Sequence, residues 1–284
     1  MRRTRIVSTI GPSSDSPEIL ESLLRAGVDV CRLNYSHGEP ATKTPIYERI
    51  RGFESIIGRP TCILADLPGP KLRLGEFPGV IVLVKGQSVE LHCGVAKMRN
   101  ASAAKLPVEY AGLSSELNVN DPVLIADGLI RLVVTQTKGK SAGIVKCVVD
   151  DGGPVSARKG INVPGTMVDL PAIGQHDKLA LEHALQNGAD YIAVSYVRTA
   201  ADLLPAKEAI KKAGQHVPII AKIEHPTALE NLEEILDVAD AVMVARGDLG
   251  VEIPLEQVPL AQQKIIDGAL QRGMPVIVAT QMLD

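Results

Sequence analysis

The chain has 284 residues, which is enough for one large domain or two smaller ones. Hydrophobic residues make up 45% of it and the formal net charge is −3, a balance typical of soluble globular proteins and not of nucleic-acid binders, which carry a basic face. Aromatic residues make up only 2%, with no tryptophan, which argues against recognition of bases by stacking. No apolar run approaches the roughly 20 residues that a membrane span needs, and Met1-Arg2-Arg3 leads directly into a predicted strand rather than a signal peptide.

The cysteines are scattered singly and show no CxxC spacing of the kind that metal or redox sites use. We expect them to be buried free thiols, and we therefore expect a cytoplasmic protein, because thiols stay reduced in that compartment. The four are Cys31, Cys62, Cys93 and Cys147.

The first elements follow one another as strand, helix and strand. A β-type apolar run over 5–10 is followed by Ser16 and Pro17, an N-cap and first-turn proline that predict the start of a helix. The helix should end near Gly27, where the strand over 28–34 begins. Its buried face is predicted from Leu20, Leu23 and Leu24.

Strand and helix patterns continue to alternate, which predicts a parallel sheet covered by helices, either a TIM barrel or a doubly wound sheet. The strands are expected near 5–10, 28–34, 61–66, 190–196, 217–223, 240–245 and 275–280. One helical face between the fifth and sixth strands is formed by Leu229, Leu232, Ile235 and Leu236. Seven strands, and a sequence that ends at Asp284 just after the seventh, favour an eight-stranded α/β barrel that is incomplete at its C-terminus. A seven-stranded open sheet is the alternative.

Between the third and fourth strands the hydrophobic pattern of the sequence changes. From about Gly75 to Lys159 helical periodicity is lost, and short apolar runs alternate with turn signals such as Asp127-Gly128 and Lys138-Gly139. This pattern predicts a small all-β domain inserted into a barrel loop, where it can act as a lid. We expect domain limits of 1–69 and 169–284 for the barrel and 70–168 for the insert.

Neither common phosphate-binding loop is present. Gly139-Lys140-Ser141 resembles the end of a Walker A loop, but Val134 stands where that loop needs its first glycine, and the surroundings are β-type. GxGxxG does not occur. A nucleotide would have to be bound in another way.

Charged residues end two of the predicted strands and suggest a metal-assisted site for an anion. Lys222 and Glu224 are two residues apart, so their side chains point to the same side of a strand. Glu224 and Asp248, at the ends of neighbouring strands, are hard oxygen ligands suited to Mg²⁺ or Mn²⁺. A structural salt bridge is the alternative for the first pair, but the second carboxylate favours the metal site. Gly247-Asp248-Leu249-Gly250 predicts a turn whose N–H groups suit a carboxylate or phosphate, with an ordinary glycine-rich turn as the alternative.

Other strand ends contribute further candidates. Arg32, Asn34 and Ser36 share one side of the second strand by alternation, and an arginine there can grip phosphoryl oxygens with two N–H groups. A helix cap or a salt bridge is the alternative for Arg32 alone, and His37 is better explained by a structural than by a catalytic role. The remaining candidates are Asp66 and Arg73, around the end of the third strand, and the hydroxyl of Thr280, which closes the seventh.

Taken together, these segments resemble the pyruvate kinase family. The resemblance extends over essentially the whole chain, in family order. The matching blocks are RIVSTIGP, RLNYSHG, DLPGPKLR, DGLIRL, KGINVPG, IAVSYVR, IIAKIEHP, AVMVARGDLGVEIP and VIVATQM. It implies a TIM barrel interrupted by a β-barrel lid, and transfer of the phosphoryl group of phosphoenolpyruvate to ADP, giving pyruvate and ATP in glycolysis.

The same resemblance implies roles for individual residues. Glu224 and Asp248 would hold Mg²⁺ or Mn²⁺, Lys222 would stabilise the phosphoryl group in transfer, and the N–H groups of Gly247 and Asp248 would take the substrate carboxylate. Thr280 would assist protonation of the enolate. The implied phosphate-side and nucleotide-side residues are Arg32, Arg73, Asn34, His37 and Lys159, with Asn34, Ser36, Asp66 and Leu67 around a monovalent-cation site.

Two departures from the family pattern matter. Leu67 and Lys71 replace the threonine and glutamate that accompany K⁺ dependence, so we expect the Lys71 ammonium to substitute for K⁺. The sequence also stops before the eighth strand and the C-terminal domain, so we expect a truncated chain whose complete form is a homotetramer. The alternatives left open are a non-catalytic or regulatory derivative of this fold, and a related phosphoenolpyruvate/pyruvate lyase or aldolase, against which the long β-insert argues.

Overall fold

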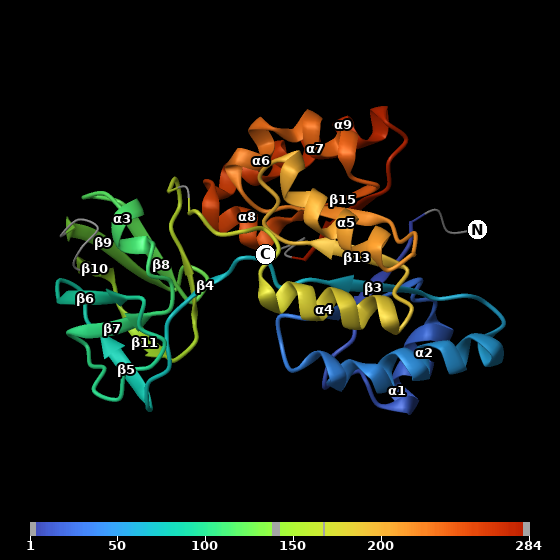
Figure 1. Cartoon of the computed structure of the whole chain (residues 1–284), viewed down its shortest axis with the longest axis horizontal. Coiled ribbons are helices and arrows are strands. Elements are labelled where there is room, and N and C mark those ends of the chain that lie inside the picture. Colours follow the sequence, from blue (N-terminus) through green and yellow to red (C-terminus); the bar gives the residue numbers. More distant parts are fainter. Residues whose placement is uncertain (1–3, 138–142, 167, 281–284) are drawn as a thin grey trace. The chain divides into compact units, whose positions relative to one another are not determined.

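The computed structural model describes residues 4–137, 143–166 and 168–280, which belong to two compact units (Figure 1). The first unit comprises 1–70, 171–246 and 260–284, and the second comprises 71–170 and 247–259. The limits expected from the sequence did not separate 247–259 from the barrel segment. The glycine, lysine and serine at 139–141 that resemble a Walker A loop, and the turn predicted at Lys138-Gly139, lie outside the described residues.

The first unit is built on a parallel sheet that contains all seven expected strands. Each strand pairs with its neighbours in the parallel sense, and the order in the sheet follows the order in the chain. The strands are β1 (Val7–Thr9), β2 (Val30–Asn34), β3 (Cys62–Asp66), β13 (Tyr191–Val194), β14 (Ile219–Ile223), β15 (Ala241–Ala245) and β16 (Val276–Ala279). A doubly wound sheet reverses its strand order at a switch point, whereas a barrel does not. The observed order confirms the expected incomplete α/β barrel.

Helices cover one face of this sheet. They are α1 (Pro17–Ala26), α2 (Thr44–Ile57), α4 (Gln175–Gln186), α5 (Leu204–Lys212), α6 (Pro226–Glu230), α7 (Leu232–Val238) and α9 (Val258–Gln271). The chain also forms α8 (Arg246–Glu252), which belongs almost entirely to the second unit, and 3₁₀ turns at Pro40–Lys43, Ala200–Leu203 and Leu255–Gln257. The expected limits of α1 are confirmed. The Ser16 side chain accepts a hydrogen bond from Ile19 N at 3.4 Å, and Gly27 ends the helix with a φ of +105°, which glycine adopts without steric cost.

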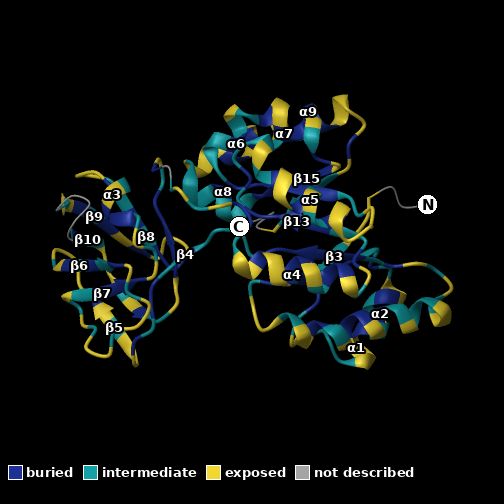
Figure 2. Cartoon of the chain, viewed as in Figure 1, coloured by how far each residue is buried: buried dark blue, intermediate teal, exposed yellow. Residues whose placement is uncertain are grey.

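The two faces of the sheet have separate cores. The larger core lies between sheet and helices and includes Leu20, Leu24, Ile63 and Ile223. The opposite face carries a smaller cluster, formed by Leu64, Ala193, Ile220, Ala241 and Met243. Figure 2 shows the strands of the sheet mostly buried, and every residue of β14 and β15 is buried, as expected for parallel strands covered on both sides. This second face carries the candidate site.

Two local predictions were wrong. The single helix expected between the fifth and sixth strands is divided at Asn231 into α6 and α7. The Asn231 side chain donates to the carbonyl of Arg198 at 3.1 Å, and its φ and ψ of −99° and 20° leave the helical region, so a tertiary contact overrides the helical periodicity. The turn predicted at 247–250 is instead part of α8, which begins at Arg246 directly after β15.

The 71–170 part of the second unit is the expected all-β insert, and α3 (Leu113–Glu116) is a short helix within it; 247–259 adds most of α8 to the unit. Its main sheet has the order β4-β12-β8-β9-β10-β6-β7, and β5 pairs with β11 in a separate ladder. The strands are β4 (Leu72–Arg73), β5 (Val80–Leu83), β6 (Ser88–Cys93), β7 (Lys105–Val108), β8 (Pro122–Ile125), β9 (Ile130–Thr137), β10 (Ile144–Asp151), β11 (Gly153–Ser156) and β12 (Gly160–Asn162). The turn predicted at Asp127-Gly128 joins β8 to β9, with positive φ at both residues. The unit has its own hydrophobic core, so it is a domain in the structural sense.

None of the helices in the described part of the chain is long and apolar enough to span a membrane. All four cysteines are free, as expected, and three are buried while Cys62 is half-buried. Burial raises the pKa of Cys31, Cys62 and Cys147 to about 12 and that of Cys93 to about 11, so these thiols are unreactive near neutral pH.

Candidate active site

Polar side chains gather on the smaller-core face of the parallel sheet, at the carboxyl ends of its strands. Arg32, Asp66 and Lys222 occupy the last part of β2, β3 and β14, each two residues beyond an apolar residue of the same face. The alternation read from the sequence for Arg32 and Lys222 agrees with this arrangement, and Glu224 continues the alternation just after β14. Asp66 was expected only at the end of its strand, where it lies. In an α/β barrel this end of the strands is where active sites are built.

Lys222 is the centre of the cluster. Its ammonium donates to Ser195 Oγ at 2.7 Å, and it lies 2.9 Å from Glu224 Oε1 and 3.1 Å from Asp66 Oδ1. The Lys222 side chain is only 9% exposed. Burial by itself would lower the pKa of Lys222, but the carboxylates of Glu224 and Asp66 more than offset this effect, so the pKa is raised. The two carboxylates therefore favour the charged ammonium form of Lys222, which suits it to holding an anion.

Asp66 is shared between two cations. Its Oδ2 accepts from Arg32 Nε at 2.8 Å and also faces Arg32 Nη2, while its Oδ1 faces Lys222 without the alignment of a hydrogen bond. Asp66 is completely buried, whereas the Arg32 side chain is 24% exposed. Arg32 Nη1 also donates to Thr9 Oγ1 at 2.8 Å. A guanidinium has five N–H donors, so Arg32 keeps donors for a ligand after these contacts.

Glu224 is held from both sides. Its Oε1 faces Lys222, and its Oε2 accepts a hydrogen bond of 2.7 Å from the backbone N–H of Tyr196, whose φ is +52°. The Glu224 side chain is 1% exposed. The salt bridge considered for Lys222 and Glu224 therefore exists. This salt bridge does not prevent the Glu224 carboxylate from binding a metal ion, since each carboxylate oxygen has a second lone pair.

Ser195 was missed by the sequence reasoning, although its segment was recognised. It accepts from Lys222 and donates to the carbonyl of Leu67 at 2.6 Å, so it joins the lysine to the backbone that follows β3. Gly69 makes this packing possible, because a Cβ there would lie 2.6 Å from Ser195 Cβ. A hydroxyl just after the fourth strand was the available signal, of the same kind that singled out Thr280.

The segment after β3 is fixed by a buried carboxylate that was also missed. Asp177, in the first turn of α4, accepts from Gly69 N at 2.7 Å through Oδ1 and from Gly174 N at 3.0 Å through Oδ2. Burial raises the pKa of Asp177, although both N–H groups act in the opposite direction. Asp177 therefore positions the Gly69 turn against Ser195.

The candidates at and just after the ends of β2 and β3 lie in different surroundings. Asn34 stands beside Asp66 in the strand register, and its Oδ1 accepts from Ser36 N at 2.9 Å. The side chain of His37 is exposed, and only its carbonyl has a structural role, as acceptor for Lys43 Nζ at 2.7 Å. Leu67, expected near a monovalent cation, buries its side chain in the large core.

Thr280 follows β16 directly, so its strand is separated from that of Lys222 by β15. Thr280 is exposed and has a φ of +25°.

The other candidates belong to the second unit. Arg73 Nη1 donates to the carbonyl of Arg158 at 3.2 Å, next to Lys159, which is exposed. The Lys71 ammonium lies 3.8 Å from Asp127 Oδ1, and the Lys71 stem passes over Gly160, where a Cβ would be 2.8 Å from Lys71 Cε.

Gly247 and Asp248 form the first turn of α8, whose initial N–H groups have no partner within the helix. The end of α8 is joined to β12, because Asn162 Nδ2 donates to Glu252 Oε1 at 2.9 Å.

The part of the chain that the structure describes contains no group of three or more His, Cys, Asp or Glu side chains able to enclose a metal ion. Mg²⁺ is commonly bound by one or two carboxylates together with water and substrate phosphates. Glu224 fits this requirement with its buried carboxylate. Asp248 is the third residue after β15, the strand next to that of Glu224.

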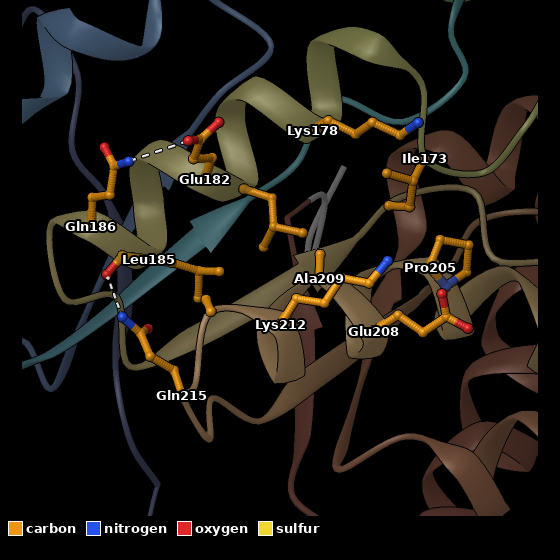
Figure 3. A pocket seen from close by; sticks show the side chains of 12 residues that line it. Ile173, Lys178, Glu182, Leu185, Gln186, Pro205, Glu208, Ala209, Lys212 and Gln215 are labelled. Atoms are coloured by element: carbon orange, nitrogen blue, oxygen red, sulfur yellow. Dashed lines mark hydrogen bonds between the residues drawn. The ribbon is translucent and has the colours of Figure 1, made fainter.

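A groove between α4 and α5 lies outside the candidate site (Figure 3). It has a volume of about 640 Å³ and an apolar floor that includes Ile173 and Leu185. Its charged residues are two lysines and two glutamates, Lys178, Lys212, Glu182 and Glu208. These charges balance, so they favour no particular class of ligand.

Comparison with known proteins gives a consistent result. The family described as "Pyruvate kinase, barrel domain" matches residues 1–284. The chain is 45% identical over 284 residues to a protein named pyruvate kinase from Mycobacterium intracellulare, and 42% identical over 284 residues to one from Corynebacterium glutamicum. Each alignment covers 100% of this chain but only 59% and 58% of the relative. The chain thus spans less than two thirds of the length of these proteins.

Proposed function

The chain belongs to the pyruvate kinase family, and we propose that it carries the residues that transfer the phosphoryl group of phosphoenolpyruvate to ADP, giving pyruvate and ATP. The observation that supports this most strongly is the buried ammonium of Lys222, kept charged between Glu224 and Asp66. Phosphoryl transfer needs little covalent chemistry from a protein and depends on positioning and on fixed positive charge. A preorganised lysine and arginine around one carboxylate provide both.

Lys222 and Arg32 would both contact the phosphoryl group, in different roles. Lys222 cannot rotate freely, because Ser195 and two carboxylates fix its position, so its charge is in place before the reaction begins. Arg32 would bind phosphoryl oxygens with the N–H groups that Asp66 and Thr9 leave unused. Neither group exchanges a proton in this scheme.

The remaining roles rest on the resemblance. Glu224 and Asp248 would hold Mg²⁺ or Mn²⁺, which when bound supplies charge neutralisation for the transferring group. The N–H groups of Gly247 and Asp248 would hold the substrate carboxylate, and Thr280 would assist protonation of the enolate carbon. The nucleotide would contact Asn34, His37, Arg73 and Lys159.

The Lys71 ammonium would replace the K⁺ that many family members need. The support for this proposal is the pair of departures from the family pattern, Leu67 and Lys71; in the structure the Lys71 ammonium lies 3.8 Å from the exposed carboxylate of Asp127. We further propose that the protein is cytoplasmic and assembles as a homotetramer.

A lactate-dehydrogenase-coupled assay with ADP, phosphoenolpyruvate and Mg²⁺ tests the proposal, and calorimetric titration with phosphoenolpyruvate adds a readout that does not need turnover. We expect Lys222→Met to abolish pyruvate formation and to weaken binding. Lys207→Met is the matched control, because it removes an ammonium that is half-buried, donates to Val238 O and lies outside the site. Wild-type pyruvate formation no faster than that of Lys222→Met would reject catalysis by this chain and favour the non-catalytic alternative.

A further inference from the structure

The second unit contains a pocket that the proposed reaction does not use. Its volume is about 600 Å³, within the range of small-molecule sites. Three segments that are distant in the sequence build it, and backbone hydrogen bonds join them. Glu76 N donates to Ala96 O at 2.7 Å, Met98 N to Glu76 O at 2.8 Å, and Arg158 N to Gly75 O at 3.4 Å. The pocket is therefore part of the fold of this unit rather than a gap between loose loops.

The charges that line the pocket do not balance. Lys97, Arg99 and Arg158 carry three positive charges, and Glu76 carries the only negative one. Glu76 holds two of the cations in place, because its carboxylate lies 3.2 Å from Lys97 Nζ and is hydrogen-bonded to Arg158 Nη2. The net charge of +2 matches a dianion.

Hydrogen-bond donors remain available for such an anion. Arg158 has five N–H donors and uses one on Glu76, and Lys97 likewise retains two of three. Arg99 forms neither a hydrogen bond nor an ion pair with any residue in the described ranges. The backbone of Arg158 has a φ of +62°, which is unfavourable for a residue with a side chain and fixes the direction in which that side chain leaves the loop.

Apolar groups complete the lining. Phe77 is almost fully buried, and Pro78 and Met98 lie beside it. Inorganic phosphate would leave this surface without a partner, whereas a ring attached to the phosphate would cover it. We propose that this pocket binds a small organic phosphate, a phosphate monoester dianion that carries an apolar or aromatic group. Lys159 and Arg73 do not line the pocket, although Lys159 follows Arg158 in the chain and Arg73 Nη1 donates to Arg158 O at 3.2 Å.

Titration of the full chain with phenyl phosphate, followed by ¹H–¹⁵N NMR, tests this inference. We expect saturable shifts of the Glu76, Phe77 and Met98 amides, and weaker binding of inorganic phosphate and of phenol, which each supply only half of the recognised chemistry. Arg99→Gln should raise Kd about tenfold, as loss of a hydrogen bond between charged groups does. Arg99→Lys keeps the charge and should recover most of that loss.

Arg131→Gln is the matched control, because Arg131 is an exposed arginine of β9, pairs with Asp150 and lies outside the pocket. It should change Kd less than twofold, and so should Lys159→Gln. The inference is overturned if phenyl phosphate causes no saturable shifts, or if Lys159→Gln weakens binding as much as Arg99→Gln, since binding would then belong to the proposed nucleotide contact. Equal Kd values for phenyl phosphate and inorganic phosphate would also overturn it. None of these outcomes depends on pyruvate formation.

Discussion

Replacing Ser195 by alanine tests whether Lys222 is held by the network seen in the structure. The substitution removes one oxygen atom and two hydrogen bonds, from Lys222 Nζ at 2.7 Å and to Leu67 O at 2.6 Å. Both partners belong to buried residues, so water cannot replace the hydroxyl easily. The change therefore leaves a charged donor and a carbonyl with unsatisfied bonding capacity.

The expected cost follows from these two groups. A buried donor or acceptor left without a partner costs about 1–3 kcal/mol, and more when it is charged. Lys222 keeps its two carboxylate neighbours, which limits the loss on its side. We therefore expect the free energy of unfolding to fall by about 2–4 kcal/mol, a large part of the roughly 5–15 kcal/mol that holds a typical domain folded.

Urea unfolding followed by circular dichroism measures this change. Ser55→Ala is the matched control, because the Ser55 hydroxyl also donates to a backbone carbonyl, that of Gly52 at 3.0 Å, but is exposed. It should change the free energy of unfolding by no more than about 0.5 kcal/mol. If Ser195→Ala costs as little as Ser55→Ala, the hydroxyl does not hold Lys222 and the positioning argument is wrong.

Three further predictions concern other parts of the chain. Gly69→Ala should destabilise the fold by about 1–3 kcal/mol more than Gly58→Ala. Both glycines have a φ of +73°, but only at Gly69 would a Cβ lie within 4 Å of another residue. Equal unfolding midpoints for the two variants would contradict this prediction. Burial and the nearby Lys43 lower the pKa of His183. The contribution of neutral His183 to stability is therefore complete above about pH 6.5 and is lost as the pH falls below that value. An NMR titration that gives a His183 pKa above 6.5 would refute this. Pyruvate formation should be unchanged when tetramethylammonium replaces K⁺, and it should become K⁺-dependent in a Leu67→Thr/Lys71→Glu double variant. If the wild-type chain requires KCl, the Lys71 ammonium does not take the place of K⁺.

The sequence by itself determined the framework of the site. Buried parallel strands are continuous apolar runs, and side chains alternate strictly between two faces, so seven strands and the common face of Lys222 and Glu224 follow from local pattern. The start and end of α1 were equally local, because one serine, one proline and one glycine determine them.

Tertiary structure decided which groups meet. Asp66 contacts both Arg32 and Lys222 because of how the neighbouring strands are aligned. Ser195 joins Lys222 to the segment after β3 because Gly69 allows the close approach. The division between α6 and α7 has the same origin, since the carbonyl that Asn231 binds comes from a residue 33 positions earlier. Periodicity within one segment carries no information about such partners, because the partner is supplied by another part of the chain.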